Sequence, residues 1–157
     1  MLRRLSPLLP LALLAACNPA TTRPAFAPLP EAPSAAVAQP VPAATEQLAA
    51  ALRADGVPLA RVAPRDGFIE SPWFDARSGR PHAHGAAGAV GTDVVRVRAW
   101  VEPIDRRRST LTLEAVYHAV TDPSLPPREL DRPLPPQHPL ALRLRQTLDS
   151  LAGRPGR

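Results

Sequence analysis

The sequence predicts an α+β domain in which an antiparallel, four-stranded meander carries an N-terminal and a C-terminal helix on one face. Two stretches in which apolar and polar residues alternate, residues 93–102 and 109–120, indicate a central β-hairpin. A third stretch, residues 139–153, repeats leucines at helical spacing and ends in a glycine. All three patterns lie within residues 45–153, a length that suits one small domain.

The elements predicted before the hairpin are one helix and two strands: residues 45–55, 57–63 and 68–75. Thr45 suits the N-cap of the helix, and Gly56 would end it. The dipeptide Asp66-Gly67 supplies the turn between the two strands. Pro72 has no backbone N–H, so it restricts the second strand to a sheet edge or a bulge.

Alternation in the predicted hairpin assigns its residues to two faces. The residues expected on the core face are Val95, Val97, Ala99, Val101, Leu111, Leu113, Ala115 and Tyr117. The opposite face is expected to meet solvent and carries Trp100 together with Arg96 and Arg98. Glu114 on this face is placed to pair with either arginine across the strands. Two segments rich in glycine or proline are predicted to be irregular: residues 76–92 and 121–137.

Charge and cysteine content exclude several classes of protein. All 19 basic residues are arginines, and they are interspersed among 14 acidic residues rather than clustered. Abundant arginine, alanine and proline without lysine indicates a GC-rich coding sequence, and we expect no nucleic-acid partner. Cys17 is the single cysteine, which excludes an internal disulfide and a metal site built from several cysteines.

The first 17 residues combine a basic start, a short apolar stretch and a cysteine. Arg3 and Arg4 precede about ten mostly apolar residues, too few to span a bilayer as a helix. The stretch ends in Leu14-Ala15-Ala16-Cys17, which resembles the lipobox of bacterial lipoproteins. The resemblance implies that residues 1–16 are a signal peptide and that Cys17 is diacylglycerated, becomes the first residue after cleavage and is N-acylated. An ordinary secretory signal peptide with a coincidental cysteine is the alternative.

Residues 17–44 are predicted to be a lipidated cysteine followed by a disordered tether. From residue 18 onward this segment contains seven prolines and nine alanines and shows no apolar periodicity. An extended chain of this composition reaches roughly 80 Å from a membrane surface. Bacterial lipoproteins retained in the inner membrane commonly carry aspartate after the modified cysteine, so Asn18 implies an outer-membrane anchor, with the domain facing the periplasm. Residues 154–157 are predicted to be a short disordered tail.

We expect neither catalysis nor a cofactor from this sequence. It contains no Gly-x-Ser-x-Gly elbow and no His-Glu-x-x-His helix. His82 and His84 have a spacing that suits one metal ion on extended backbone, but no third ligand lies near them in sequence, so no metal site is expected. A ligand site that uses Glu70, His82 or His84 under the segment 76–92 is the alternative.

Two surfaces are candidates for binding. The predicted solvent-exposed sheet face presents Trp100, Arg96 and Arg98, a composition common at protein interfaces. The hairpin turn presents three consecutive cations to lipid phosphates, lipopolysaccharide or the carboxylates of peptidoglycan. These cations are Arg106, Arg107 and Arg108. The alternatives are a tryptophan covered by the proline-rich segment 121–137 and a turn that is merely solvated.

The order of lipobox, proline-rich tether and small α+β domain resembles the BamC family of outer-membrane assembly lipoproteins. The resemblance is carried by Asp66-Gly67-Phe68-Ile69-Glu70-Ser71-Pro72-Trp73-Phe74, in which a glycine-bearing turn enters a strand ending in tryptophan, and by the arginine-rich strand up to Trp100. BamC-like proteins carry two such domains, whereas this chain has room for one. The resemblance implies a role beside the machinery that assembles outer-membrane barrels.

Together these patterns predict an outer-membrane-anchored lipoprotein with a non-catalytic periplasmic domain. The domain would bind an envelope protein as a scaffold in envelope assembly or maintenance. Two alternatives stay open. One is a tethered binder of peptidoglycan, lipopolysaccharide, a small ligand or a metal, and the other is a spacer between the outer membrane and the cell wall.

Overall fold

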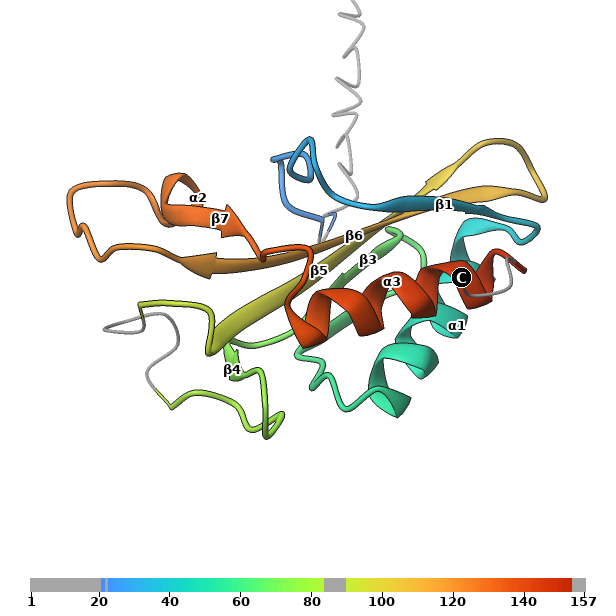
Figure 1. The fold of residues 1–157 in the computed structure, drawn as a ribbon. Helices are drawn as coiled ribbons and strands as arrows, with labels where there is room; N and C mark the ends of the chain where they lie inside the picture. The colour runs from blue at the N-terminus through green and yellow to red at the C-terminus, as the bar shows by residue number, and fades with distance from the viewer. Residues whose placement is uncertain (1–20, 22, 84–89, 154–157) are drawn as a thin grey trace, which may run out of the picture.

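The computed structural model describes residue 21 and the segments 23–83 and 90–153. Within these residues the chain forms a seven-stranded antiparallel sheet and three helices (Figure 1). In chain order the elements are β1 (Ser34–Val37), α1 (Val41–Ala54), β2 (Arg61–Ala63), β3 (Phe68–Glu70), β4 (Phe74–Asp75), β5 (Val94–Pro103), β6 (Ser109–His118), α2 (Pro127–Leu130), β7 (Asp131–Pro133) and α3 (Pro139–Leu151). The predicted α+β class with an antiparallel sheet is confirmed.

The long hairpin of β5 and β6 is the centre of the sheet, and the shorter strands lie along its two outer edges. β3 and then β2 extend the sheet from β5, while β4 pairs with the other end of β5. β1 and β7 both pair with β6, at opposite ends of that strand. The sheet is therefore larger than the predicted four-stranded meander: β2, β3, β5 and β6 follow that order, and β1, β4 and β7 are added to them.

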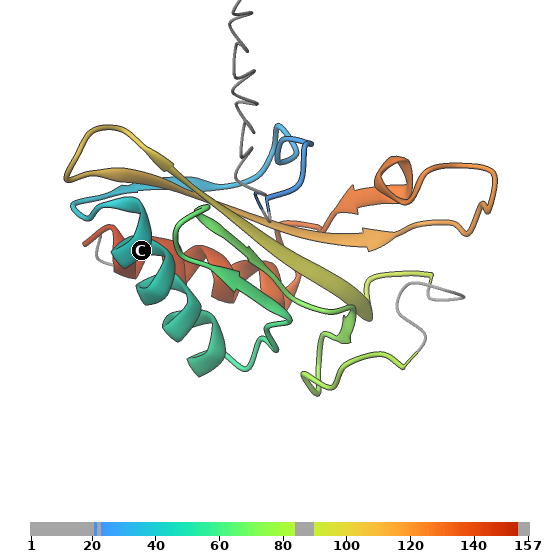
Figure 2. The same cartoon turned by 180° about the vertical axis from the view of Figure 1, so that it is seen from behind.

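Helices α1 and α3 lie on one face of the sheet and enclose the main core (Figures 1 and 2). The helices contribute buried leucines: Leu48, Leu52, Leu140, Leu144 and Leu148. The sheet contributes the alternate residues of β5 expected on the core face: Val95, Val97, Ala99 and Val101. Each fully buried aliphatic side chain of this kind contributes about 1.5–3 kcal/mol to folding. The alternation of apolar and polar residues thus determines which face of the central hairpin packs in the core, and the helical spacing of the leucines determines which face of α3 does.

Helix α1 begins four residues earlier than predicted. Its first residue is Val41, and Pro42 in the first turn has a φ already suited to a helix. Thr45 is buried inside the helix, where its hydroxyl donates to the Val41 carbonyl at 2.7 Å instead of capping the N terminus. Both long helices thus carry a proline in their first turn, Pro42 in α1 and Pro139 in α3.

The predicted strand 68–75 is interrupted at Pro72, as that residue predicts. Ser71 bridges the interruption. Its N–H donates to the Val97 carbonyl at 2.9 Å, and its hydroxyl oxygen accepts from the Val97 N–H at 2.8 Å. A side-chain oxygen therefore replaces a backbone carbonyl in the ladder, and the chain continues as β4.

The structure corrects the predicted tether, because part of residues 17–44 belongs to the folded domain. β1 pairs with β6 from Ser34–Thr112 to Val37–Ser109, and its inward-facing alanine and valine are buried in the core. Residues 23–33, which we call the strap, cross the sheet face opposite the helices (Figure 1). The small side chains and prolines of this segment leave no apolar periodicity, so its composition alone indicates disorder.

Residues 121–137, predicted to be irregular, contain helix α2 and strand β7. β7 pairs with the end of β6, from Val116–Pro133 to His118–Asp131. Beyond it, the Leu134 N–H donates to the Ala115 carbonyl at 2.8 Å. A strand of only three residues is too short to show the alternation of apolar and polar residues by which strands are predicted.

Gly67 is expected to tolerate a side chain poorly. It has a φ of +63°, and a Cβ added there would clash with the carbonyl oxygen of Val101 in β5. We expect Gly67→Ala to lower the free energy of unfolding by more than about 3 kcal/mol, because a left-handed conformation costs about 1–2 kcal/mol and the clash adds to it. Gly56→Ala is the control, since Gly56 has a φ of +80° in open space. Urea unfolding measures both losses, and equal losses would contradict the contact.

Candidate functional site

The sheet face opposite the helices is covered by the strap, which places Phe26 over it. The ring of Phe26 contacts two guanidinium groups. Its centroid is 5.1 Å from Cζ of Arg98 and 4.5 Å from Cζ of Arg128. Cation–π contacts contribute about 0.5–2 kcal/mol each, more where water is excluded. Phe26 is therefore an anchor point of the strap.

Trp100 is buried, which corrects the prediction that it lies exposed on this face. Its side chain has no exposed surface. The rings of Phe26 and Phe68 pack edge-on against it, with centroids 6.2 Å and 5.6 Å away. Its Nε1–H has no hydrogen-bond partner among the described residues. A residue of the strap thus packs on Trp100, which does not form an open contact surface.

Beside Phe26 lies a cluster of ionisable side chains, which we call the charge cluster. Its members are Glu70, Arg98, Glu114, His118, Arg128 and Asp131. Nε of Arg98 donates to Oε1 of Glu70 at 3.1 Å. Nη1 of Arg98 donates to Oε1 of Glu114 at 3.0 Å and to Oδ2 of Asp131 at 2.8 Å. The predicted pairing of Glu114 with an arginine of the hairpin is confirmed for Arg98.

Glu114 links the charge cluster to the strap. Its Oε1 accepts from Nη1 of Arg128 at 2.6 Å, and its Oε2 accepts from Nη2 of the same arginine at 2.9 Å. Oε2 also accepts from the backbone N–H of Leu29 at 2.8 Å. Nη2 of Arg128 donates in turn to the carbonyl of Ala27 at 2.9 Å. One buried carboxylate therefore fixes the strap directly and through a bidentate arginine.

The charge cluster extends to His118 and, beyond it, to Trp73 and Arg96. Nε2 of His118 lies 3.0 Å from Oδ1 of Asp131, and the imidazole packs edge-on against Trp73 at 4.6 Å. Cζ of Arg96 lies 5.0 Å from the Trp73 ring, and its Nη1 lies 3.6 Å from Oε1 of Glu70. Its Nε has no hydrogen-bond partner among the described residues. Arg96, like Arg98, thus contacts its own chain.

Burial and pairing act in opposite directions on these arginines. Burial disfavours the charged form of Arg98, but hydrogen bonds to Asp131 and the other carboxylates outweigh it and raise the pKa of its guanidinium. Hydrogen bonds to Glu114 likewise raise the pKa of Arg128. Arg96 has fewer partners, so burial lowers its pKa. Guanidiniums stay ionised at neutral pH, so Arg96, Arg98 and Arg128 together balance the three carboxylates of the charge cluster.

The geometry of the charge cluster suits positioning better than proton transfer. Each of its carboxylates is already held by an ion pair with at least one guanidinium of the same chain. The hydroxyl of Ser71, which follows Glu70 in the chain, donates to the Pro72 carbonyl at 2.7 Å and accepts from the Val97 N–H. What this arrangement does is hold the strap and the α2 segment against the sheet.

The hairpin turn is an exposed cationic site, as predicted for Arg106, Arg107 and Arg108. The carboxylate of Asp105 turns back into the turn. Its Oδ1 accepts from the N–H groups of Arg107 and Arg108 at 2.8 Å and 2.9 Å, and its Oδ2 accepts from Nε of Arg108 at 2.7 Å. These bonds, led by that from the Arg107 N–H, lower the pKa of Asp105. Arg106 and Arg107 have no carboxylate within salt-bridge distance among the described residues.

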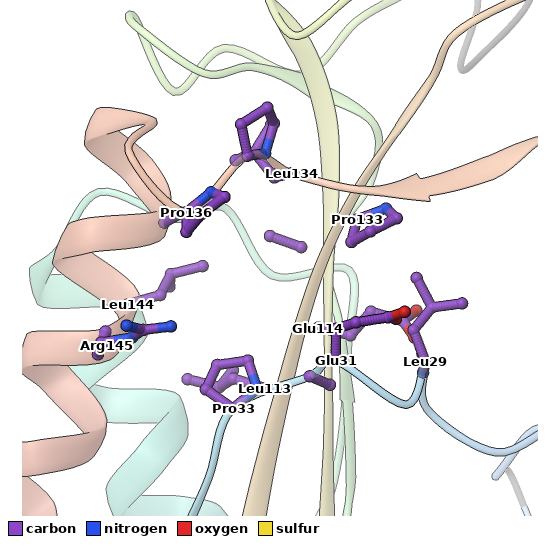
Figure 3. A pocket seen from close by; sticks show the side chains of 14 residues that line it. Leu29, Glu31, Pro33, Leu113, Glu114, Pro133, Leu134, Pro136, Leu144 and Arg145 are labelled. Carbon is purple, nitrogen blue, oxygen red and sulfur yellow. Dashed lines mark hydrogen bonds between the residues drawn. The ribbon is translucent and has the colours of Figure 1, made fainter.

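A pocket of about 370 Å³ opens at the edge of β6, in the space between β1 and β7 (Figure 3). Leucine and proline side chains converge on it from the strap, β6, β7, α3 and the segment that joins β7 to α3: Leu29, Pro33, Leu113, Pro133, Leu134, Pro136 and Leu144. Two exposed side chains of opposite charge, Glu31 and Arg145, also line it. Its size and apolar walls are those of a binding pocket for small molecules or for side chains of a partner.

The other predicted site residues are dispersed or lie outside the described part. Cys17 and His84 are outside the described residues. His82 is half-buried, and its backbone N–H donates to the Trp73 carbonyl at 2.8 Å. Among the residues that the structure describes, no three histidine, cysteine or acidic side chains are grouped to hold a metal. No helix in that part of the chain is long and apolar enough to cross a membrane.

Sequence reasoning missed Phe26, Arg128 and Asp131 as partners of the predicted site. They lie far along the chain from Arg98, in segments without periodicity. The one available signal was that Phe26 is the single aromatic residue between Asn18 and Ala44.

No protein-family model matches this chain, and no curated protein matches it. Its function is therefore inferred from three features of its own geometry. These are a covered sheet face with a balanced charge cluster, an exposed cationic turn and an apolar pocket.

Arg98→Met is expected to destabilise the fold strongly. It removes one of the two guanidiniums that pair with the almost fully buried carboxylates of Glu114 and Asp131, and Arg128 alone is left to neutralise both. Breaking a buried pair costs about 3–5 kcal/mol. Arg108→Met is the control, because it removes an exposed pair with Asp105 and should cost less than about 1 kcal/mol. Denaturant unfolding compares the two. Similar losses would show that the charge cluster contributes no more than a surface ion pair.

Proposed function

We propose that this chain is an outer-membrane lipoprotein anchored through acylated Cys17. Its folded domain faces the periplasm and is a non-catalytic module that binds a protein of envelope assembly or maintenance. The lipobox at residues 14–17 supports the anchor. The paired state of every carboxylate in the charge cluster supports a role without catalysis. The resemblance to BamC-like proteins supports the setting in envelope assembly.

The observation that carries the binding role is the apolar pocket at the edge of β6. An apolar centre with charged residues at its margin is the usual anatomy of a protein interface, and here Glu31 and Arg145 supply the charges. The pocket replaces the Trp100 face as the proposed contact surface, because the strap occupies that face.

Anchoring lowers the affinity that such a pocket needs. A domain confined to a membrane surface meets membrane partners at a raised effective concentration, so a contact that is weak in solution is sufficient. A few apolar side chains from one partner segment would fill a pocket of about 370 Å³.

A photo-crosslinking amino acid at position 145, at the pocket margin, is expected to capture a defined envelope protein in intact cells. Ala141→Phe, which fills the pocket from α3, should reduce this crosslink by about tenfold or more, because apolar contacts at an interface centre carry most of its binding energy. Leu142→Phe, at an exposed position on the same helix, is the matched control and should leave it unchanged.

Two outcomes would contradict the pocket as the contact surface. One is a crosslink from position 145 that survives Ala141→Phe, and the other is a crosslink of equal yield when the probe is placed at the exposed neighbour Gln146. The volume and apolar walls of the pocket favour a small apolar ligand as the second candidate. Capture of a small molecule in place of a protein, again lost in Ala141→Phe, would select that candidate.

The anchor has its own test. Mass spectrometry of the chain purified from membranes is expected to show an N-terminal Cys17 carrying a diacylglyceryl group and an amide-linked acyl chain. Cys17→Ser should release the protein from membranes washed in high salt, because the lipid anchor is lost and any remaining contact with anionic headgroups is screened. An unmodified Cys17, or membrane retention of Cys17→Ser resistant to high salt, would contradict lipid anchoring at this residue.

A further inference from the structure

The turn between β5 and β6 is an exposed surface separate from the pocket. We propose that this turn, residues 104–108, lies against the membrane that holds the anchor and binds the anionic headgroups of its phospholipids. The inference rests on the proposed lipid anchor at Cys17. It adds a second, electrostatic contact to that anchor.

The construction of the turn gives it an outward positive charge. Asp105, its one acidic residue, directs both carboxylate oxygens at groups within the turn. The Ile104 N–H donates to the Arg108 carbonyl at 2.9 Å and closes the turn. Arg106 and Arg107 are left as exposed cations with no acidic partner within salt-bridge distance in the described part of the chain. The charge available to a ligand is therefore positive.

The turn also carries an apolar side chain that its own fold does not cover. Ile104 is 47 % exposed, next to the cations. A shallow hollow lined by Ala38 and by residues 105–108 lies beside it. Arginines that flank an exposed aliphatic residue suit a lipid surface, where phosphates meet the guanidiniums and the aliphatic group enters the interface. A soluble acidic peptide would have no need of the exposed isoleucine.

The strap brings the anchored end of the chain to the same end of the sheet. Nη2 of Arg23 donates to Oε1 of Glu102 at 2.6 Å, and Glu102 is the second-last residue of β5 before the turn. Arg23 is six positions after Cys17, a chain length that spans at most about 20 Å. Arg106 is four positions after Glu102, at most about 14 Å.

These distances replace the reach of roughly 80 Å expected for a fully extended tether. Because the strap is fixed to the sheet at Phe26, Leu29 and Arg23, only the residues before Arg23 separate the domain from an acylated Cys17. The turn is then held much closer to the anchored residue than the roughly 80 Å of an extended tether. Each arginine near an anionic leaflet strengthens association about fivefold, and the effect is screened by salt.

The test uses the chain from residue 17 to residue 157 with Cys17→Ser, which contains every described residue and has no acyl group. It is mixed with vesicles of phosphatidylcholine alone, or of equal parts phosphatidylcholine and phosphatidylglycerol, and sedimented. We expect binding to the anionic vesicles only, weakened by salt. Arg106→Gln with Arg107→Gln should reduce it by about twentyfold or more. Ile104→Ser should also weaken binding at low salt, because it removes the aliphatic group that enters the interface.

The matched control is Arg53→Gln with Arg77→Gln, which removes the same charge from exposed arginines elsewhere in the domain and should change binding less than about twofold. Equal binding to both kinds of vesicle, or equal losses in the turn and control variants, would overturn the proposal. The vesicle assay needs no acyl group, so its result is independent of the lipid anchor. If the vesicle assay fails while mass spectrometry shows that Cys17 is acylated in cells, the proposal for the turn is overturned and the proposed lipid anchor stands.

Discussion

The buried carboxylate of Glu114 is the group on which the rest of this structure depends. Its two oxygens accept four hydrogen bonds, from Arg98 in β5, Arg128 in α2 and the backbone of Leu29 in the strap. A carboxylate removed from water costs several kcal/mol unless it is fully paired. Neutralising this one charge therefore requires a strand, a short helix and the strap to be in place together. The segments that bear the donors have few leucines of their own, and ionic pairing gives them a defined position.

Covering the second face of the sheet determines where a partner can bind. The helices pack on one face, and the strap with α2 lies on the other, so the open surfaces are at the edges and ends of the sheet (Figures 1 and 2). The pocket lies at the edge of β6, between the part of that strand that pairs with β1 and the part that pairs with β7. The cationic turn lies at the end of the β5–β6 hairpin. Both proposals about function concern these two places.

Features of the fold that depend on residues close together in the chain could be predicted, and contacts between distant segments could not. The alternation in β5 predicted the valines that face the helices, and the same register predicted the pair of Glu114 with Arg98. The exposed turn at residues 106–108 followed from the same hairpin. The burial of Trp100 could not be predicted, because its cover is Phe26, which lies 74 residues earlier in a segment of prolines and alanines. Alternation distinguishes the two faces of a strand, but it does not say whether a distant segment will cover the polar one.

The sequence by itself determined the α+β class, the central hairpin, the leucine-striped C-terminal helix and the turn that bears three arginines. These are set by periodicity and by proline and glycine, which act within a few residues. Only the tertiary structure decided that the strap joins the sheet and that the face carrying Trp100 is closed. It also decided that a pocket forms between β1, β7 and α3. The physical reason is that buried charges must find partners wherever the fold brings them together, and such pairing over long sequence distances leaves no periodic trace.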